Sequence, residues 1–161
     1  MAKKPGAKRS PGAAVAVPGH RPSLQVGALC WRKAAGGVVK VLLITSRDTG
    51  RWVIPKGWPM RRRSDAEAAA REAFEEAGVR GAIAKRSMGL FSYRKGLGKG
   101  VFINCVVRVF PLEVSEMLRK YPETGQRKVK WFTTSKAAKR VGEPELAAMI
   151  RGFDPFHAPP R

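Results

Sequence analysis

Residues 57–79 read GWPMRRRSDAEAAAREAFEEAGV, and the second half of this stretch predicts the helix on which the fold depends. Residues 64–77 are mostly Ala, Glu and Arg, which are strong helix formers, and Gly78 is placed to end the helix. Ser64 and Glu67 form the S-x-x-E capping box that begins many helices. We therefore expect a helix with a defined start and a defined end.

Three glutamates share one face of this helix. At about 100° per residue, Glu76 lies about 40° from Glu72 on one side and Glu75 about 60° on the other. The opposite face is apolar and contains Ala66, Ala70, Ala73, Phe74 and Ala77. Like charges at this spacing repel by about 0.2–0.5 kcal/mol per pair, whereas a hard cation such as Mg²⁺ prefers carboxylate oxygens. The face predicts a metal site, with a solvent-exposed ion-pair ladder of Glu67, Arg71 and Glu75 as the alternative.

The charge of the chain is strongly positive. Its 161 residues include 32 Lys and Arg against 12 Asp and Glu, which gives a formal charge of +20 and a pI of about 11.1. Such a field attracts polyanions, although it can also serve only to solubilise the surface. Residues 1–22 are basic, lack acids and are rich in Pro, Gly and Ala, so we expect a disordered arm there. One folded domain is expected over residues 23–155, followed by a short tail at 156–161.

Other kinds of site are not indicated. Cys30 and Cys105 each lie in an apolar run without a second ligand nearby, so we expect buried free thiols. His20 and His157 lie near the chain ends, which argues against a zinc site or a catalytic dyad. The sequence has no apolar run long enough for a membrane span and no signal-peptide pattern, so we expect a cytoplasmic protein without membrane contact. Chemistry in this chain must therefore use carboxylates.

The remaining pattern alternates strands and helices. A hairpin is expected from residues 24–32 and 38–47, and a short strand broken by Pro55 and Gly57 follows. Further strands are expected over 82–93, 100–110 and 128–134, with a closing helix over 144–153. This order predicts an α/β fold in which helices cover both faces of a mixed sheet, an α/β/α sandwich.

Residues 57–79 resemble the Nudix box. That box has Gly, five residues, Glu, seven residues, Arg-Glu, an aliphatic residue, any residue, Glu-Glu, any residue, Gly and an aliphatic residue. The matching positions are Gly57, Arg71, Glu72, Glu75, Glu76, Gly78 and Val79, with Ala73 in the first aliphatic position. Arg63 departs from the pattern, because the family has its first glutamate there.

The flanking residues extend the resemblance to about residues 24–153. TSRDTGRWVIPKGWP before the helix, and KVKWFTTSKAAKRV and PELAAMIRGF after it, are similar to the diphosphoinositol polyphosphate phosphohydrolase branch, which also acts on dinucleoside polyphosphates. The resemblance implies a Nudix-type sandwich and a hydrolase, dependent on Mg²⁺ or Mn²⁺, that cleaves a phosphoanhydride bond in a highly phosphorylated small molecule. The alternatives are an RNA 5′-pyrophosphohydrolase and a polyanion- or RNA-binding module with impaired catalysis.

The resemblance also implies roles for the residues of the box. Glu72 and Glu76 would bind the metal, and Glu75 would act as the catalytic base or as an additional ligand. A backbone carbonyl near Gly57 would complete the metal site, and Arg71 would orient the acids by ion pairing. An additional acid from elsewhere in the chain often joins such sites, and Glu113, Glu116 and Glu123 are candidates.

Basic residues and one serine outside the box are candidates for binding substrate phosphates. Some lie next to the box and others at positions similar to substrate-contacting residues of the phosphohydrolase branch: Ser46, Arg47, Lys56, Arg94, Lys95, Arg127 and Lys128. Each could instead be ordinary surface charge. Residues 61–63, three consecutive arginines, precede the helix N-terminus and resemble either a polyanion-binding patch or a solvated loop.

Overall fold

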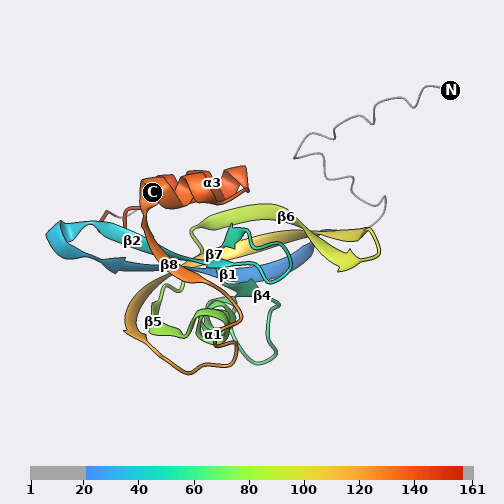
Figure 1. Cartoon of the computed structure of the whole chain (residues 1–161), viewed down its shortest axis with the longest axis horizontal. Helices are drawn as coiled ribbons and strands as arrows, with labels where there is room; N and C mark the ends of the chain where they lie inside the picture. Colours follow the sequence, from blue (N-terminus) through green and yellow to red (C-terminus); the bar gives the residue numbers. More distant parts are fainter. Residues whose placement is uncertain (1–20, 158–161) are drawn as a thin grey trace.

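A mixed sheet lies between helices in the computed structural model, which describes residues 21–157 (Figure 1). Its eight strands within that range are β1 (Ser23–Lys33), β2 (Val39–Thr45), β3 (Trp52–Val53), β4 (Lys56–Gly57), β5 (Val79–Ile83), β6 (Gly89–Gly98), β7 (Val101–Met117) and β8 (Val129–Thr133). The central order is β3-β2-β1-β7-β5, while β4 pairs with β1, β6 with β7 and β8 with β2. β1 and β7 are parallel and the other pairs antiparallel, so the expected mixed sheet is confirmed. Apart from residues 21–22, the arm expected at 1–22 lies outside the described residues.

The helices cover both faces of the sheet. Figure 1 shows α1 (Asp65–Ala77) and α3 (Pro144–Arg151) on opposite sides, and α2 (Thr134–Arg140) packs with α3. Successive side chains of a strand point to opposite faces of the sheet, so β2 contributes to both cores. Leu42 packs in the core beneath α1, while Leu43 packs beneath α2 and α3. This arrangement is the expected α/β/α sandwich. The short 3₁₀ turn η1 (Ala35–Gly37) joins β1 to β2, and none of the described helices has the length and apolarity to span a membrane.

Helix α1 begins and ends where the sequence predicts. The Ser64 hydroxyl accepts a hydrogen bond from the backbone N–H of Glu67 at 3.2 Å. Gly78 ends the helix in the left-handed region, with φ of 68°, and its N–H donates to the Phe74 carbonyl. A side chain at Gly78 would collide with the ring of Tyr121, so both the conformation and the space require glycine.

Several expected elements differ in the structure. The single strand expected over 82–93 is wrong, because β5 ends at Ile83 and β6 begins at Gly89. Between them the Ser87 hydroxyl bonds both the N–H and the carbonyl of Gly89, a local pattern that competes with strand pairing. Helix α2 was not expected, although Thr133 caps it by accepting from the N–H of Lys136. The strand expected over 100–110 continues through Met117 as β7.

The side chains of the core largely agree with the sequence. Cys30 and Cys105 are buried and free, as expected, and burial raises the pKa of the Cys30 thiol to about 12. Phe74 is an exception on α1, because it is only partly buried. Its ring lies against the guanidinium groups of Arg71 and Arg80, at 4.8 and 4.9 Å.

Candidate active site

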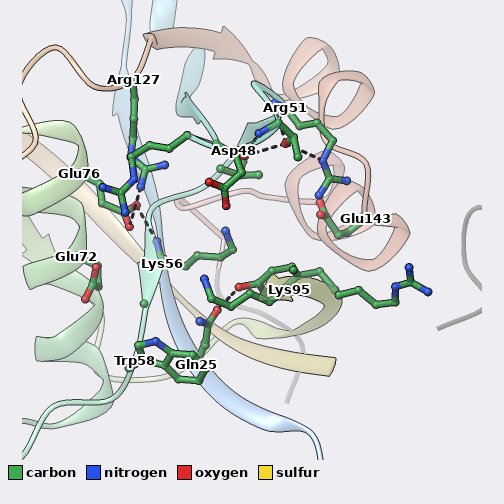
Figure 2. Close-up of a pocket in the computed structure, with 18 of the residues that line it drawn as sticks. Gln25, Asp48, Arg51, Lys56, Trp58, Glu72, Glu76, Lys95, Arg127 and Glu143 are labelled. Atoms are coloured by element: carbon green, nitrogen blue, oxygen red, sulfur yellow. Dashed lines mark hydrogen bonds and ion pairs between the residues drawn. The ribbon is translucent and has the colours of Figure 1, made fainter. Parts of the chain in front are cut away.

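A cavity of about 560 Å³ opens between α1 and strands β1, β4 and β6 of the sheet (Figure 2). Its walls come from α1, from β1, β4 and β6, from the loop after β2, and from the segment before β8. Carboxylates enter it from α1, and several cationic side chains line the rest. The cavity therefore joins groups that suit a cation to groups that suit a polyanion.

Glu72 and Glu76 project into the cavity from α1. Glu76 is only 8% exposed, and its Oε2 accepts a hydrogen bond from the backbone N–H of Lys56 at 3.3 Å. A side chain at Gly57 would collide with the carboxyl group of Glu72. Glycine at this position therefore lets the Glu72 carboxylate lie directly against β4, which holds both acids at one wall of the cavity.

The ionised forms of both acids are disfavoured in the cavity wall. Burial raises the pKa of Glu72 to about 7, with further increases from the charges of Glu75 and Glu123. Burial also raises the pKa of Glu76 to about 7, and the charge of Glu72 adds to this while Arg127 opposes it. A positive ion placed between the two carboxylates would favour their ionised forms.

Arg127 is fixed among the acids. Its Nη2 lies 3.3 Å from the Glu123 carboxylate and 3.6 Å from that of Glu76, and its Nη1 donates to the Thr45 carbonyl at 3.1 Å. The side chain is only 10% exposed. Arg127 thus offsets part of the negative charge of these acids and also lines the cavity.

Glu75 and Arg71 do not line the cavity. Arg71 Nε donates to Glu75 Oε1 at 2.8 Å, and these side chains are 39% and 31% exposed. Of the alternative ladder, the described ion pairs include this contact but none between Glu67 and Arg71. The three glutamates of the predicted face therefore separate into two that face the cavity and one that pairs beside it.

The donor atoms at the cavity wall fit a hard divalent cation in kind. Glu72 and Glu76 supply carboxylate oxygens, Glu123 lies in the same wall, and the cradle at Gly57 leaves room beside Glu72. Over residues 21–157, no three His, Cys, Asp or Glu side chains already converge as a complete set of ligands. The fit therefore rests on the Glu72–Glu76 pair.

Comparison with known proteins identifies the domain: the NUDIX domain model matches residues 22–153. The chain belongs to the NUDIX family. It is 34% identical over 127 residues to Nudix hydrolase 16, mitochondrial, of Arabidopsis thaliana, a match covering 76% of this chain and 70% of the relative. It is 32% identical to diphosphoinositol polyphosphate phosphohydrolase 3-alpha of Mus musculus, covering 69% of this chain and 64% of the relative. Against other Arabidopsis Nudix hydrolases the match spans about half of their length.

A solved structure supports the same fold. The C. elegans Ap4A hydrolase in a binary complex matches with a TM-score of 0.58, 22% identity and coverage of 80% of this chain and 93% of that one. At this identity the likeness shows the fold alone. Nudix hydrolases generally use divalent metal ions, which agrees with the donor chemistry of the Glu72–Glu76 pair.

Six of the seven residues predicted to contact substrate line the cavity of this Nudix domain. They are Ser46, Arg47, Lys56, Arg94, Lys95 and Arg127. Lys128 does not line it, and its side chain is exposed. The arginines at 61–63 are also exposed and do not line the cavity.

Several of these cations already have partners. Arg47 Nη1 donates to Gln126 at 3.0 Å, and the Arg94 guanidinium stacks 4.4 Å from the ring centroid of Phe102. Lys56 Nζ lies 4.7 Å from the ring centroid of Tyr93, and burial lowers the Lys56 pKa, while the charge of Glu76 opposes that change. A neighbouring side chain therefore positions each of these three cations.

Sequence reasoning missed part of the cavity wall. Tyr93 donates to the Gln25 side chain at 2.5 Å, and both line the cavity with Trp58 and Glu143. A lone Gln within the apolar run of β1 was the available signal for Gln25. Among the three candidate additional acids only Glu123 lines the cavity. Glu113 and Glu116 are exposed on β7.

Proposed function

We propose that this chain is a metal-dependent hydrolase that cleaves a phosphoanhydride bond in a highly phosphorylated small molecule. The substrate would be of the dinucleoside polyphosphate or diphosphoinositol polyphosphate type. The observation that carries the proposal is one cavity that joins the buried Glu72–Glu76 pair to the cationic side chains of Lys56 and Arg127. The names of the mouse and C. elegans proteins support these two substrate classes.

The proposed metal is Mg²⁺ or Mn²⁺. Glu72 and Glu76 would hold it, with Glu75 or Glu123 as an additional acid and a backbone carbonyl near Gly57. When bound, such an ion offsets phosphate charge and lowers the pKa of a coordinated water.

The remaining steps use the chain's own groups. Lys56, Arg94, Lys95 and Arg127 would bind phosphate oxygens through charge-assisted hydrogen bonds and orient the anhydride toward α1. The catalytic role predicted for Glu75, with Arg71 as its orienting partner, stays a prediction. The Arg71 guanidinium would hold this carboxylate in place through their ion pair.

A hydrolysis screen tests the proposal directly. Diadenosine polyphosphates, a diphosphoinositol polyphosphate, nucleoside triphosphates and 5′-triphosphate RNA would each be incubated with the protein and Mg²⁺ or Mn²⁺. Release of phosphate or nucleotide should require the metal and should disappear in Glu76→Gln prepared in parallel. Equal rates in that variant would assign the activity to a contaminant and contradict the proposal.

RNA 5′ ends are the second candidate substrate, because the formal charge of +20 favours long polyanions. The same screen separates this candidate from the first. Binding of RNA without turnover of any compound would instead support a polyanion-binding module with impaired catalysis, as the departure at Arg63 suggests.

A further inference from the structure

A cluster of exposed cations lies at the β8 edge of the sheet, outside the cavity. Between residues 128 and 140 the chain has five Lys and Arg and no Asp or Glu. All five side chains are exposed, and none belongs to an ion pair that the structure describes over residues 21–157. They form what we call the β8–α2 basic surface: Lys128, Lys130, Lys136, Lys139 and Arg140.

The strand and the helix bring these cations together. Lys130 Nζ lies 5.4 Å from the ring centroid of Phe132, and the Arg140 guanidinium lies 5.9 Å from the same centroid. Lys136, Lys139 and Arg140 lie at i, i+3 and i+4 on α2, so they are neighbours on the side of the helix away from its buried alanines. One positive surface therefore extends from β8 onto α2.

The fold does not require all of these charges. Lys139 and Arg140 lie in the last turn of α2, where the helix dipole favours cations. Lys136 lies in the first turn, where the dipole disfavours them, and Lys130 lies on a strand. Like charges at helical spacing also repel one another. A polyanion bound from solution would offset this repulsion.

The composition of the β8–α2 basic surface indicates the kind of polyanion. Membrane-surface helices bury Trp, Phe or Leu in lipid, and protein–protein interfaces place aromatic anchors at their centre. None of the exposed large apolar side chains described between residues 21 and 157 comes from residues 128–140. A surface of cations alone gains its affinity from phosphates through counterion release, which is how proteins bind nucleic acid backbones.

The surface also begins at the rim of the cavity. The Lys128 N–H donates to the Thr45 hydroxyl at 2.9 Å, and the adjacent Arg127 lines the cavity. From that rim β8 runs along the edge of the sheet toward α2, which has only seven residues. A flexible single strand can follow this narrow edge and bring its phosphates past the cations in turn.

We propose that the β8–α2 basic surface binds the phosphate backbone of a single-stranded nucleic acid. Its Lys and Arg side chains donate charge-assisted hydrogen bonds to phosphate oxygens and read no base. None of the five side chains lines the cavity, so this binding does not depend on the hydrolysis in the proposed function.

Binding of a uridine oligonucleotide with a 5′-hydroxyl end tests the inference, because this RNA offers no terminal phosphate to the cavity. Fluorescence anisotropy in EDTA would measure Kd between about 50 and 200 mM salt. Lys130→Gln combined with Lys136→Gln removes two phosphate contacts, so Kd at about 50 mM salt should rise by about 10-fold to 100-fold. The slope of log Kd against log salt should fall by about 1.4, at about 0.7 per contact.

A matched variant separates this surface from the overall charge. Lys85→Gln combined with Arg86→Gln removes the same charge from exposed positions between β5 and β6, which β7, β1 and β2 separate from β8. It should change Kd by less than about twofold, because neither cation contacts the bound strand. Equal losses in the two double variants would assign the binding to net charge and overturn the inference. Wild-type binding in Lys130→Gln/Lys136→Gln would overturn it as well.

Two other ligands define the partner. A thymidine oligonucleotide of the same length should show the same loss, because RNA and DNA share the phosphodiester backbone. A loss confined to RNA would overturn recognition through the backbone alone. Anionic phosphatidylserine vesicles should bind wild type and Lys130→Gln/Lys136→Gln alike. A loss for vesicles without a loss for oligonucleotides would identify a membrane surface and overturn the proposed partner.

Hydrolysis of diadenosine tetraphosphate separates this inference from the proposed function. Lys130→Gln/Lys136→Gln should keep the wild-type kcat/KM, since neither residue lines the cavity. Loss of oligonucleotide binding together with hydrolysis would show that these residues support the fold, and would overturn a separate surface. Absence of hydrolysis in wild type, with oligonucleotide binding that depends on Lys130 and Lys136, would contradict the proposed function and support the β8–α2 basic surface.

Discussion

Glu75 and Glu76 are neighbours in the sequence and differ completely in the structure. Glu76 is buried in the cavity wall, where it accepts the Lys56 N–H and lies 3.6 Å from Arg127. Glu75 lies outside the cavity and pairs with Arg71 at 2.8 Å. Two acids of one predicted face thus contact different surroundings.

The difference shows what the helical repeat does not determine. Glu72 and Glu76 are about 40° apart around the axis, whereas Glu75 lies about 60° from Glu72 on the far side. Contacts from β4 and from the segment before β8 then decide which edge of the face is buried. The tertiary contacts of the helix therefore decide which acids of one face become buried and which stay outside the cavity.

Loss of Glu76 should have the largest effect on activity. Glu76→Gln keeps the shape but removes a buried charge that would hold the metal, so kcat should fall by about 100-fold or more. Glu75→Gln, the matched neighbour, should lose about tenfold, because its carboxylate lies beside the cavity. Steady-state kinetics on the best substrate of the screen measures both. Equal losses would support the predicted catalytic role of Glu75 and remove the distinction drawn between these two residues.

Metal removal should reveal the Glu72–Glu76 pair through stability. Saturating Mg²⁺ binds the folded state only and should raise the unfolding free energy by an amount on the order of 1–3 kcal/mol. Thermal unfolding in Mg²⁺ and in EDTA measures this difference. Glu72→Gln should abolish it, while Glu67→Gln, an exposed acid on the same helix, should retain it. A metal-dependent shift that survives in Glu72→Gln would place the ion elsewhere.

The raised pKa of Glu72 should make stability depend on pH. Its pKa is about 7 in the folded protein against an ordinary value of 4.5, so the folded state holds more protons between these values. The contribution of Glu72 to the unfolding free energy should therefore be greatest below about pH 4.5 and decrease as pH rises toward 7. Because Glu72 is only partly buried, solvent screening should reduce its contribution to about 1 kcal/mol.

Urea denaturation in EDTA at pH 5 and pH 8 measures this contribution. Glu72→Gln should reduce the difference in unfolding free energy between pH 5 and pH 8, whereas Glu67→Gln should leave that difference unchanged. The same slope in wild type and Glu72→Gln would mean that solvent reaches this carboxylate freely.

Local signals predicted the elements near α1 well. Ser64 and Gly78 define its ends through one hydrogen bond and one backbone conformation, both of which are encoded in a few adjacent residues. The division between β5 and β6 was not predictable from hydrophobicity, because it depends on how Ser87 bonds Gly89. Helix α2 was missed because its main signal, the cap at Thr133, follows directly on a strand.

The candidate site was predictable where it lies within one helix. Glu72 and Glu76 follow from spacing and from the resemblance to the Nudix box. Glu143 and Tyr93 come from distant segments, and only the sheet and α3 bring them to the same cavity. No local pattern marks a residue whose role depends on a long-range contact.

The smallest expected effect concerns Arg63, where the chain departs from the Nudix box. Arg63 is exposed and precedes the capping Ser64, so it adds positive charge at the positive end of the helix dipole. Arg63→Glu should therefore stabilise the protein by about 0.3–1 kcal/mol, which urea denaturation at low salt can detect and added salt should reduce. Arg62→Glu changes the same charge one residue farther from the cap and should gain less. Because Arg63 does not line the cavity, Arg63→Glu should leave KM at its wild-type value for every substrate in a series with increasing numbers of phosphates. If the ratio of the Arg63→Glu KM to the wild-type KM rises with the number of phosphates, the longest substrates extend from the cavity to the N-terminus of α1.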